Sequence, residues 1–313
     1  MRFTGAYLRQ GDFVKRLDLK VGYACNNMCR HCAQGSKRST LAGPSSEELR
    51  HQMEEACKRG IKSVVFTGGE PTVRPDLLEL VRQAKDMGYR EIQIQTNGRR
   101  FASPAFTRAA INSGMTEFSP ALNGHIPALH DYLAQVPGAW RQTVRGIMNV
   151  RECSGIKIIS NTVITKPNYR FADRIARLLV SLGVDQFQLA FVHPCGSAWT
   201  NFDAIVPFIS LATPHIHKGL QVGLDAGLHV MAEAMPYCHM QGYEDQVSEL
   251  YIPPSDVYEA GTKIKDWEKW RIQEGKWKGD SCKTCRYYQI CEGPWREYVE
   301  RRGPSEFIPV PVQ

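Results

Sequence analysis

The stretch Leu17-Asp-Leu-Lys-Val-Gly-Tyr-Ala-Cys-Asn-Asn-Met-Cys-Arg-His-Cys32 decides how the rest of the sequence is interpreted. Its first half, Leu17–Ala24, is a β-rich run of strand length. Cys25, Cys29 and Cys32 follow at once, within eight residues. In parallel α/β sheets, the residues directly after a strand lie at the carboxyl edge, where such folds place their chemistry. The stretch therefore predicts a strand that delivers three thiolates to a functional edge.

Outward from this stretch, β-rich runs alternate with segments whose apolar residues recur at three- and four-residue spacing. We predict strands at Leu17–Ala24, Lys62–Thr67, Glu91–Gln95, Thr116–Leu122, Lys157–Ile164 and Gln186–Val192. We predict helices at Ser45–Arg59, Pro75–Met87, Pro104–Asn112, Trp140–Cys153 and Tyr169–Leu182. This alternation is typical of an α/β fold with a parallel sheet wrapped by helices. Six units are fewer than the eight of a closed barrel, so we expect a curved sheet that stays open along one side.

The alternation fades beyond His193, where proline, glycine and aromatic residues become frequent and a second group of cysteines appears. We therefore divide the chain into an N-terminal segment (1–16), a core (17–195) and a small, irregular, cysteine-rich C-terminal extension (196–313). No signal-peptide-like stretch or bilayer-length apolar run is present, which favours a cytoplasmic protein without membrane contact. The net charge of +7 is spread along the chain, so nucleic-acid binding is not supported.

Three thiolates on one short loop can ligate three irons of a four-iron, four-sulfur cluster, which leaves the fourth iron open. An open coordination position is where a substrate or cofactor binds, whereas a purely electron-carrying cluster normally has four protein ligands. A structural zinc site would need a fourth ligand, and only His31 is close. Within so tight a loop His31 could hardly reach the same ion, so the pattern favours a cluster.

The Cys25-x3-Cys29-x2-Cys32 spacing resembles the signature of the radical S-adenosylmethionine (SAM) superfamily, including a histidine before the third cysteine. Thr67-Gly68-Gly69-Glu70-Pro71 looks like the family's GGEP motif. The resemblance implies a partial (βα)6 barrel that contains one [4Fe-4S] cluster and binds SAM. It also implies that the glycine backbone and Glu70 receive the SAM amino group, since glycine allows close approach and a carboxylate pairs with an ammonium.

Further contacts with SAM are implied at Asn97, which ends the third predicted strand, and at Asn161 on the fifth. Relatives often have Ser-Leu-Asp-Gly at the end of the fourth strand, whereas this chain has Ala121-Leu122-Asn123-Gly124. The usual serine contact is therefore missing, and either Ser119 or Ser160 is a candidate replacement.

Near the C-terminus, Cys282-x2-Cys285-x5-Cys291 resembles the SPASM and twitch extensions of radical SAM enzymes, which bind auxiliary iron-sulfur clusters. The number of cysteines supports one auxiliary [4Fe-4S] cluster, although the C-x2-C spacing also fits zinc. Cys238 is the first candidate for a fourth ligand and Cys195 is its rival. Cys195 follows the sixth predicted strand, where it could instead donate a hydrogen atom to a substrate radical.

The resemblance implies an oxidoreductase or maturase in which the reduced cluster cleaves SAM and the 5′-deoxyadenosyl radical abstracts a substrate hydrogen. Relatives with such extensions often modify ribosomally made peptides, and we expect a peptide substrate here. Dehydrogenation or epimerisation of a small molecule such as an aminosugar is the alternative. A flavodoxin or ferredoxin is the expected electron donor. A non-catalytic iron-sulfur or zinc protein is the alternative from a different class.

Overall fold

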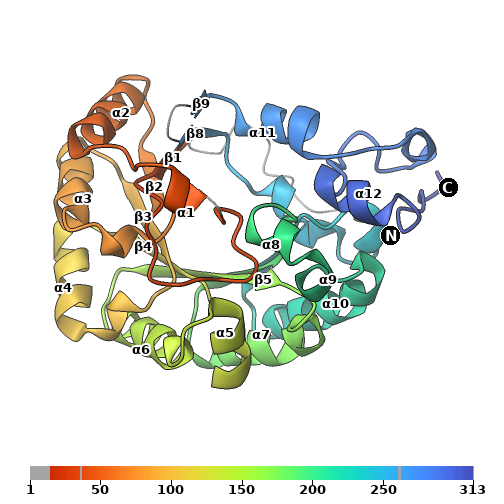
Figure 1. Cartoon of the computed structure of the whole chain (residues 1–313), viewed down its shortest axis with the longest axis horizontal. Helices are drawn as coiled ribbons and strands as arrows, with labels where there is room; N and C mark the ends of the chain where they lie inside the picture. Colours follow the sequence, from red (N-terminus) through yellow and green to blue (C-terminus); the bar gives the residue numbers. More distant parts are fainter. Residues whose placement is uncertain (1–14, 36, 260–261, 313) are drawn as a thin grey trace.

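The computed structural model describes residues 15–35, 37–259 and 262–312. Nine strands form one sheet in the order β7-β6-β5-β4-β3-β2-β1-β8-β9 (Figure 1). Every neighbouring pair is parallel except the antiparallel pair β8 and β9. The strands are β1 (Arg16–Lys20), β2 (Ser63–Thr67), β3 (Glu91–Thr96), β4 (Glu117–Pro120), β5 (Lys157–Ile164), β6 (Gln186–Phe191), β7 (His229–Glu233), β8 (Ser255–Glu259) and β9 (Thr262–Ile264).

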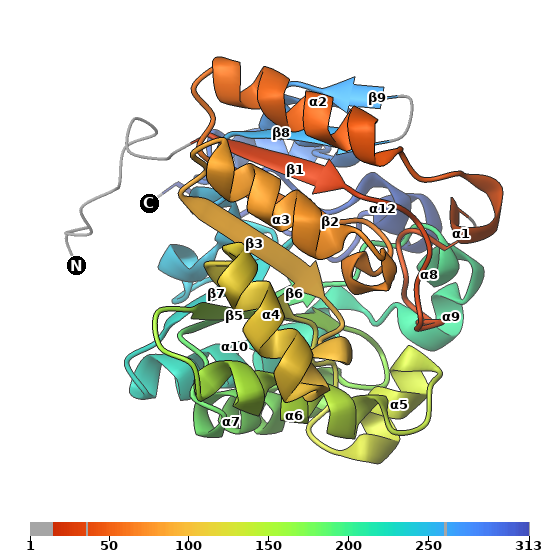
Figure 2. The same cartoon turned by 90° about the vertical axis from the view of Figure 1, so that its left-hand side faces the viewer.

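Helices cover the outer face of this sheet, and Figure 2 shows α2, α3 and α4 side by side against it. The longer helices are α2 (Ser46–Lys58), α3 (Leu77–Asp86), α4 (Pro104–Ser113), α5 (Pro127–Ala134), α6 (Ala139–Arg151), α7 (Ala172–Ser181) and α10 (Ile209–Asp225). The shorter helices include α1 (Lys37–Thr40), α8 (Ser197–Thr200), α9 (Phe202–Ile205), α11 (Trp267–Trp270) and α12 (Arg296–Arg302). α2 begins with a capping box, in which Ser45 accepts a hydrogen bond from the Glu48 amide and Glu48 accepts one from the Ser45 amide.

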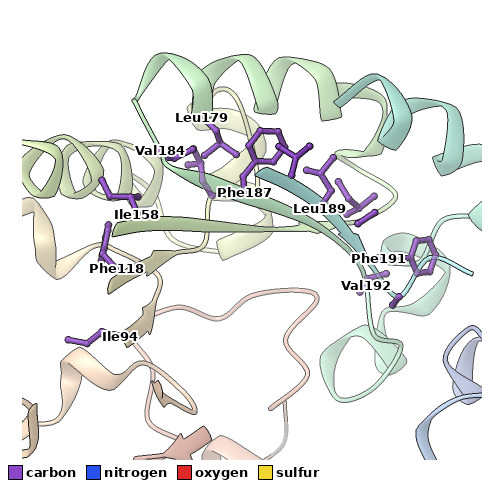
Figure 3. Packing of buried hydrophobic residues seen from close by; sticks show 14 of the residues in the cluster. Ile94, Phe118, Ile158, Leu179, Val184, Phe187, Leu189, Phe191 and Val192 are labelled. Atoms are coloured by element: carbon purple, nitrogen blue, oxygen red, sulfur yellow. The ribbon is translucent and has the colours of Figure 1, made fainter. Parts of the chain in front are cut away.

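The hydrophobic core lies between the sheet and its helices. Alternate strand residues such as Ile94, Phe118, Ile158 and Phe187 point toward the helices, where Leu179 of α7 packs (Figure 3). Full burial of each such side chain contributes about 1.5–3 kcal/mol. This outer core fixes which residues of each strand face the opposite way, into the lumen of the partial barrel.

Polar side chains occupy the lumen side of the strands and bond to each other across neighbouring strands. Thr67 Oγ1 of β2 donates to Gln95 Oε1 of β3 at 2.8 Å. The Gln188 amide of β6 donates to the Glu233 carboxylate of β7. A lumen that is lined by amides and carboxylates is suited to a polar guest.

The six predicted βα units are confirmed, with ends that differ by at most four residues. The sheet then continues where the sequence suggested irregular structure, because α10 and β7 add a further unit and β8 pairs with β1. Pro214 inside α10 interrupts the sequence pattern of a helix. β8 pairs with β1, and the buried carboxylate of Asp256 on β8 forms an ion pair with Arg59 Nη1, directly after α2, at 2.6 Å. Among the helices in the described ranges, none has the length and apolar character needed to cross a bilayer.

Candidate cofactor site

The segment that leads to Cys25 is held against the end of β2 by backbone hydrogen bonds. The parallel ladder continues past β1, with the Val21 amide 2.9 Å from the Thr67 carbonyl oxygen. The Gly69 amide then donates to Gly22 O, and the Glu70 amide to Ala24 O, both at 2.8 Å. The Gly68-Gly69-Glu70 turn therefore lies beside the cysteine loop, as the predicted strand order requires.

Gly68 and Gly69 are needed because two backbone segments approach each other very closely here. A Cβ on Gly69 would lie 2.4 Å from both the Tyr23 and the Ala24 carbonyl oxygens. A Cβ on Gly68, whose φ is +123°, would lie 2.3 Å from Gly22 O. Contacts below about 3.0 Å do not occur for real Cβ atoms. The sequence explained these glycines by approach to a ligand, and the structure adds that they allow the cysteine loop to pack.

The Glu70 side chain is almost fully buried, with 3% of its surface exposed, and joins the ends of β2 and β3. Its Oε1 accepts hydrogen bonds from the Thr72 amide at 3.0 Å and from the Thr72 and Thr96 hydroxyls at 2.6 Å. Its Oε2 accepts one from the Asn97 amide at 2.7 Å. Glu70 therefore organises the loops beneath the expected SAM site, and only Oε2 has spare acceptor capacity for a ligand.

Replacing Glu70 by Gln should destabilise the protein by about 2–3 kcal/mol, because one oxygen of the buried acceptor becomes an NH2 group facing N–H or O–H donors. Urea unfolding of the anaerobic protein measures this loss. Glu79→Gln on α3 is the matched control, since Glu79 is 53% exposed and its change should fall within about 0.5 kcal/mol. Equal stability losses for the two variants would contradict the role of the Glu70 carboxylate in joining the ends of β2 and β3.

The thiols of Cys25, Cys29 and Cys32 are all free and partly buried on one loop. Burial, followed by the charges of Cys32 and Cys25, raises the pKa of Cys29 to about 12. Burial also raises the pKa of Cys25. Three crowded thiolates thus need positive charge beside them, which iron would provide. Three thiolates on one loop fit a polynuclear cluster, in which each thiolate binds a different iron.

His31 does not turn toward the three thiols but packs below the loop against α5. Its Nε2 lies 3.5 Å from Asn123 Nδ2, and His130 Nδ1 accepts from the Asn123 amide at 3.1 Å. Asn123 Oδ1 accepts from the Val163 amide at 2.9 Å. Asn123, which stands where relatives often have aspartate, is thus built into a neutral network. Burial lowers the pKa of His130 to about 4, which keeps its ring neutral.

The depressed pKa of His130 predicts acid-sensitive stability. Its pKa is about 4 when folded and 6.5 in the unfolded reference, so its contribution is present above pH 6.5 and is lost as the pH falls toward 4. Between pH 7.5 and 5.5 the loss should be about 1 kcal/mol. Denaturant unfolding at these two pH values should show it in the wild type. The pH dependence should be smaller in His130→Asn, whose Oδ1 can replace Nδ1, and an unchanged pH dependence would contradict the assignment.

The predicted ribose contacts differ in availability. Asn161 faces the lumen, and its Oδ1 is buried without a hydrogen-bond partner among the described residues. Ser119 shares the lumen side with Gln95, with which it is paired across β3 and β4. Ser160 points to the opposite side of β5 and donates to Pro120 O at 3.1 Å. The Asn97 side chain already donates a hydrogen bond from Nδ2 to Asn26 Oδ1 at 2.6 Å. Asn161 and Ser119 therefore remain the available polar groups.

The four C-terminal candidates are brought together around one pocket. Cys238, Cys282, Cys285 and Cys291 line it, together with apolar and backbone atoms. Burial and then the neighbouring cysteines, Cys291 first, raise the pKa of Cys238 to about 12. Cys195 lies elsewhere, with its Sγ 3.9 Å from Ala33 O beside the first cysteine loop. The placement thus favours Cys238 over Cys195 as the fourth member of the C-terminal set.

An aromatic stack joins this extension to the mouth of the barrel. The Trp295 and His193 rings are parallel within 5°, with centroids 3.8 Å apart, and Lys276 Nζ lies 4.0 Å from the Trp295 centroid. Glu297 Oε1 lies 3.2 Å from His193 Nε2. Sequence reasoning missed Trp295, Lys276 and Glu233. No local spacing pattern marks them, since Trp295 stacks on a ring about a hundred residues away and Glu233 bonds to Gln188 on a different strand.

Comparisons with known proteins agree with this geometry. A probable GTP 3′,8-cyclase from Sulfurisphaera tokodaii is 28% identical over 195 residues, which cover 62% of this chain and 61% of that protein. An AdoMet-dependent heme synthase from Methanosarcina barkeri is 30% identical over 173 residues, covering 55% and 49%. The chain thus spans about half to three-fifths of the length of these curated relatives.

Among solved structures, Streptococcus suis SuiB bound to its precursor peptide SuiA matches 95% of this chain and 75% of its own, with a TM-score of 0.69 and 16% identity. Native anSMEcpe with bound AdoMet matches 90% and 89%, with a TM-score of 0.63 and 12% identity. At these identities the likeness establishes the fold, including the C-terminal extension. The family model of the Radical SAM superfamily matches residues 19–179, just over half of the chain, and covers the cysteine loop, the Gly68-Gly69-Glu70 turn and the strands behind them. The chain therefore belongs to the radical SAM superfamily.

Proposed function

We propose that this chain binds SAM at the cluster held by Cys25, Cys29 and Cys32, cleaves it reductively, and abstracts a hydrogen atom from a peptide substrate. The cluster supplies one electron, so that SAM yields methionine and a 5′-deoxyadenosyl radical, which becomes 5′-deoxyadenosine when it takes the substrate hydrogen. The protein has to bind, orient and shield these reactants. The observation that carries this proposal is the cysteine loop fixed at the mouth of a polar lumen.

We assign the SAM ammonium, the SAM ribose and the hydrogen-atom donor to groups among the described residues. The backbone beside Gly69 and the spare acceptor position of Glu70 Oε2 suit the SAM ammonium. The unpartnered Asn161 Oδ1 and the Ser119 hydroxyl suit the donors of a ribose. Cys195 lies beside the first cysteine loop, and we assign it the donation of a hydrogen atom to a substrate radical.

An auxiliary [4Fe-4S] cluster is the proposed occupant of the C-terminal pocket. Four thiols line the pocket, and the Cys282-x2-Cys285-x5-Cys291 spacing resembles that of extensions that bind auxiliary clusters. The cluster could accept the second electron when a substrate radical is oxidised and loses a proton.

Cys238→Ala should therefore bind less iron than the wild type, because one iron of the auxiliary cluster loses its protein ligand, while the first cluster remains. Cys195→Ala is the matched control and should keep its full iron content. Iron and zinc analysis after anaerobic reconstitution checks both. Iron loss in Cys195→Ala alone would show that the fourth ligand has been misassigned.

A peptide is the favoured substrate because the lumen presents both donors and acceptors, as an amide backbone requires. Gln95, Gln188 and Glu233 provide them from three different strands. SuiB, whose fold covers nearly all of this chain, was solved with a precursor peptide bound. The small-molecule alternative draws on the curated relatives, one of which is named for a reaction of GTP.

Mass spectrometry distinguishes these substrates. The reconstituted protein is incubated in D2O with SAM, dithionite and synthetic peptides encoded beside its gene. A peptide mass lower by two hydrogens indicates a crosslink or dehydrogenation. Incorporation of one deuterium into the peptide indicates epimerisation. Peptide-stimulated formation of 5′-deoxyadenosine supports the proposal, whereas stimulation by an aminosugar and by no peptide would replace it with the alternative.

A further inference from the structure

The outer face of the cysteine loop is exposed and carries a group of arginines. The loop lies between α5 and α8, with Met28 N bonded to Ala134 O and Cys32 O bonded to Ser197 N (Figure 1). Met28, which directly precedes Cys29, is 58% exposed, and Tyr132 is 45% exposed. We call the surface formed by Met28, Arg30, Arg38, Arg99 and Tyr132 the loop face.

Each arginine of the loop face contacts the loop or α5 through neutral groups. Arg38 Nη1 donates to Asn27 O at 2.5 Å and lies 3.4 Å from Met28 Sδ. Arg99 Nη1 donates to Asn27 Oδ1 at 2.8 Å. Arg30 donates to Tyr132 O at 3.1 Å and stacks over its ring at 4.3 Å. These contacts hold the three guanidinium groups along the cysteine loop and α5, with that of Arg38 against Met28.

The positive charge of the loop face is not neutralised by the chain itself. Within the described ranges, none of these three arginines forms an ion pair. Asp131 is the acidic residue of α5, and its two carboxylate oxygens already accept from the Gly138 and Trp140 amides, each at 2.7 Å. Elsewhere on the surface, arginines such as Arg50 and Arg82 pair with a nearby glutamate.

From this arrangement we infer that the loop face is the docking surface for an acidic one-electron carrier protein. This inference rests on the proposed function, since each SAM cleavage consumes one electron. Electron transfer between proteins requires close approach to the cluster, and Met28 is adjacent to a cluster ligand. The exposed Met28 side chain lies beside three arginines that form no ion pair among the described residues. Such a surface matches a partner with the opposite charge. Such a surface also raises the rate of encounter with that partner.

The test compares a protein reductant with a small one in the absence of substrate. Reduced flavodoxin is the probe for the acidic carrier, and dithionite, which needs no docking, is the reference. Met28→Glu and Arg30→Gln change the loop face without altering a cluster ligand. Arg108→Glu is the control, since Arg108 is exposed on α4, a helix that packs on α3 and α6. Visible absorbance and iron content verify that each variant carries its clusters.

Two quantities are measured in each variant, the rate of cluster reduction by EPR and the yield of 5′-deoxyadenosine. With flavodoxin at low salt, the cluster of both loop-face variants should be reduced at least about tenfold more slowly than that of the wild type. The rate in Arg108→Glu should match the wild-type rate. The difference should shrink at about 0.5 M salt, where charges are screened within a few ångströms. With dithionite all four proteins should behave alike.

Flavodoxin rates that fall no further in the loop-face variants than in Arg108→Glu would overturn the inference, as would a wild-type rate that is indifferent to salt. Failure of the wild type with dithionite would be a different result, because it would remove the proposed SAM chemistry itself.

Discussion

Cys29→Ala is expected to abolish formation of 5′-deoxyadenosine, with a fall of more than about 10³-fold under dithionite. The variant removes one of three thiolates on a single loop, and within the described ranges no other Cys, His, Asp or Glu joins them in a group that could hold an ion. His31 cannot substitute, because it is turned toward Asn123. An iron that loses its only protein ligand leaves the cluster incomplete, so the loss should also appear as missing iron and visible absorbance.

Cys153→Ala is the matched control for this loss. Cys153 lies just after α6 and its thiol contacts only Asn149 O, at 3.5 Å, among the described hydrogen bonds. Its removal should leave iron content and SAM cleavage near the wild-type level. Activity retained in Cys29→Ala, or lost equally in Cys153→Ala, would contradict the assignment of the first cluster.

Gly69→Ala should have the second largest effect, destabilising the protein by about 3 kcal/mol or more. The added Cβ would lie 2.4 Å from two carbonyl oxygens and 2.6 Å from the Tyr23 carbonyl carbon. These are backbone atoms one and two residues before Cys25, so relief of the clash has to move the cysteine loop. We therefore expect lower iron content together with a lower midpoint of urea unfolding.

Gly22→Ala tests whether that effect comes from the close contact. A Cβ at Gly22 meets no atom within 4 Å, although the residue lies in the same segment. Its stability and iron content should stay close to those of the wild type. If the two variants lost stability to the same extent, packing between the Gly68-Gly69-Glu70 turn and the loop would not be what positions Cys25.

The sequence predicted those parts of the molecule that local patterns determine. Cys25, Cys29 and Cys32 directly follow a strand, and the turn at Gly68 follows the next, so the parallel order of β1 and β2 brings both motifs to one edge. The Lys157–Ile164 strand was predicted to the residue from its β-rich composition.

Long-range contacts account for what the sequence left open or missed. Nothing local distinguishes Cys238 from Cys195, and only folding places Cys238 with Cys282, Cys285 and Cys291. β8 joins the sheet through its pairing with β1, more than two hundred residues away. The motif around Glu70 could be recognised, but two of the four hydrogen bonds to its carboxylate come from Thr96 and Asn97 and depend on where β3 ends.

The EPR spectrum of the reduced cluster, recorded with and without SAM in the double variant Cys282→Ala/Cys285→Ala, tests the central claim most directly. With two of the four auxiliary thiols removed, this variant should contain only the first cluster, so its signal is not overlaid by the auxiliary one. If three thiolates leave one iron open for SAM, addition of SAM will change the signal, and 5′-deoxyadenosine will form as the signal decays. A signal that SAM leaves unchanged, or a protein that binds only zinc at Cys25, Cys29 and Cys32, would contradict the account.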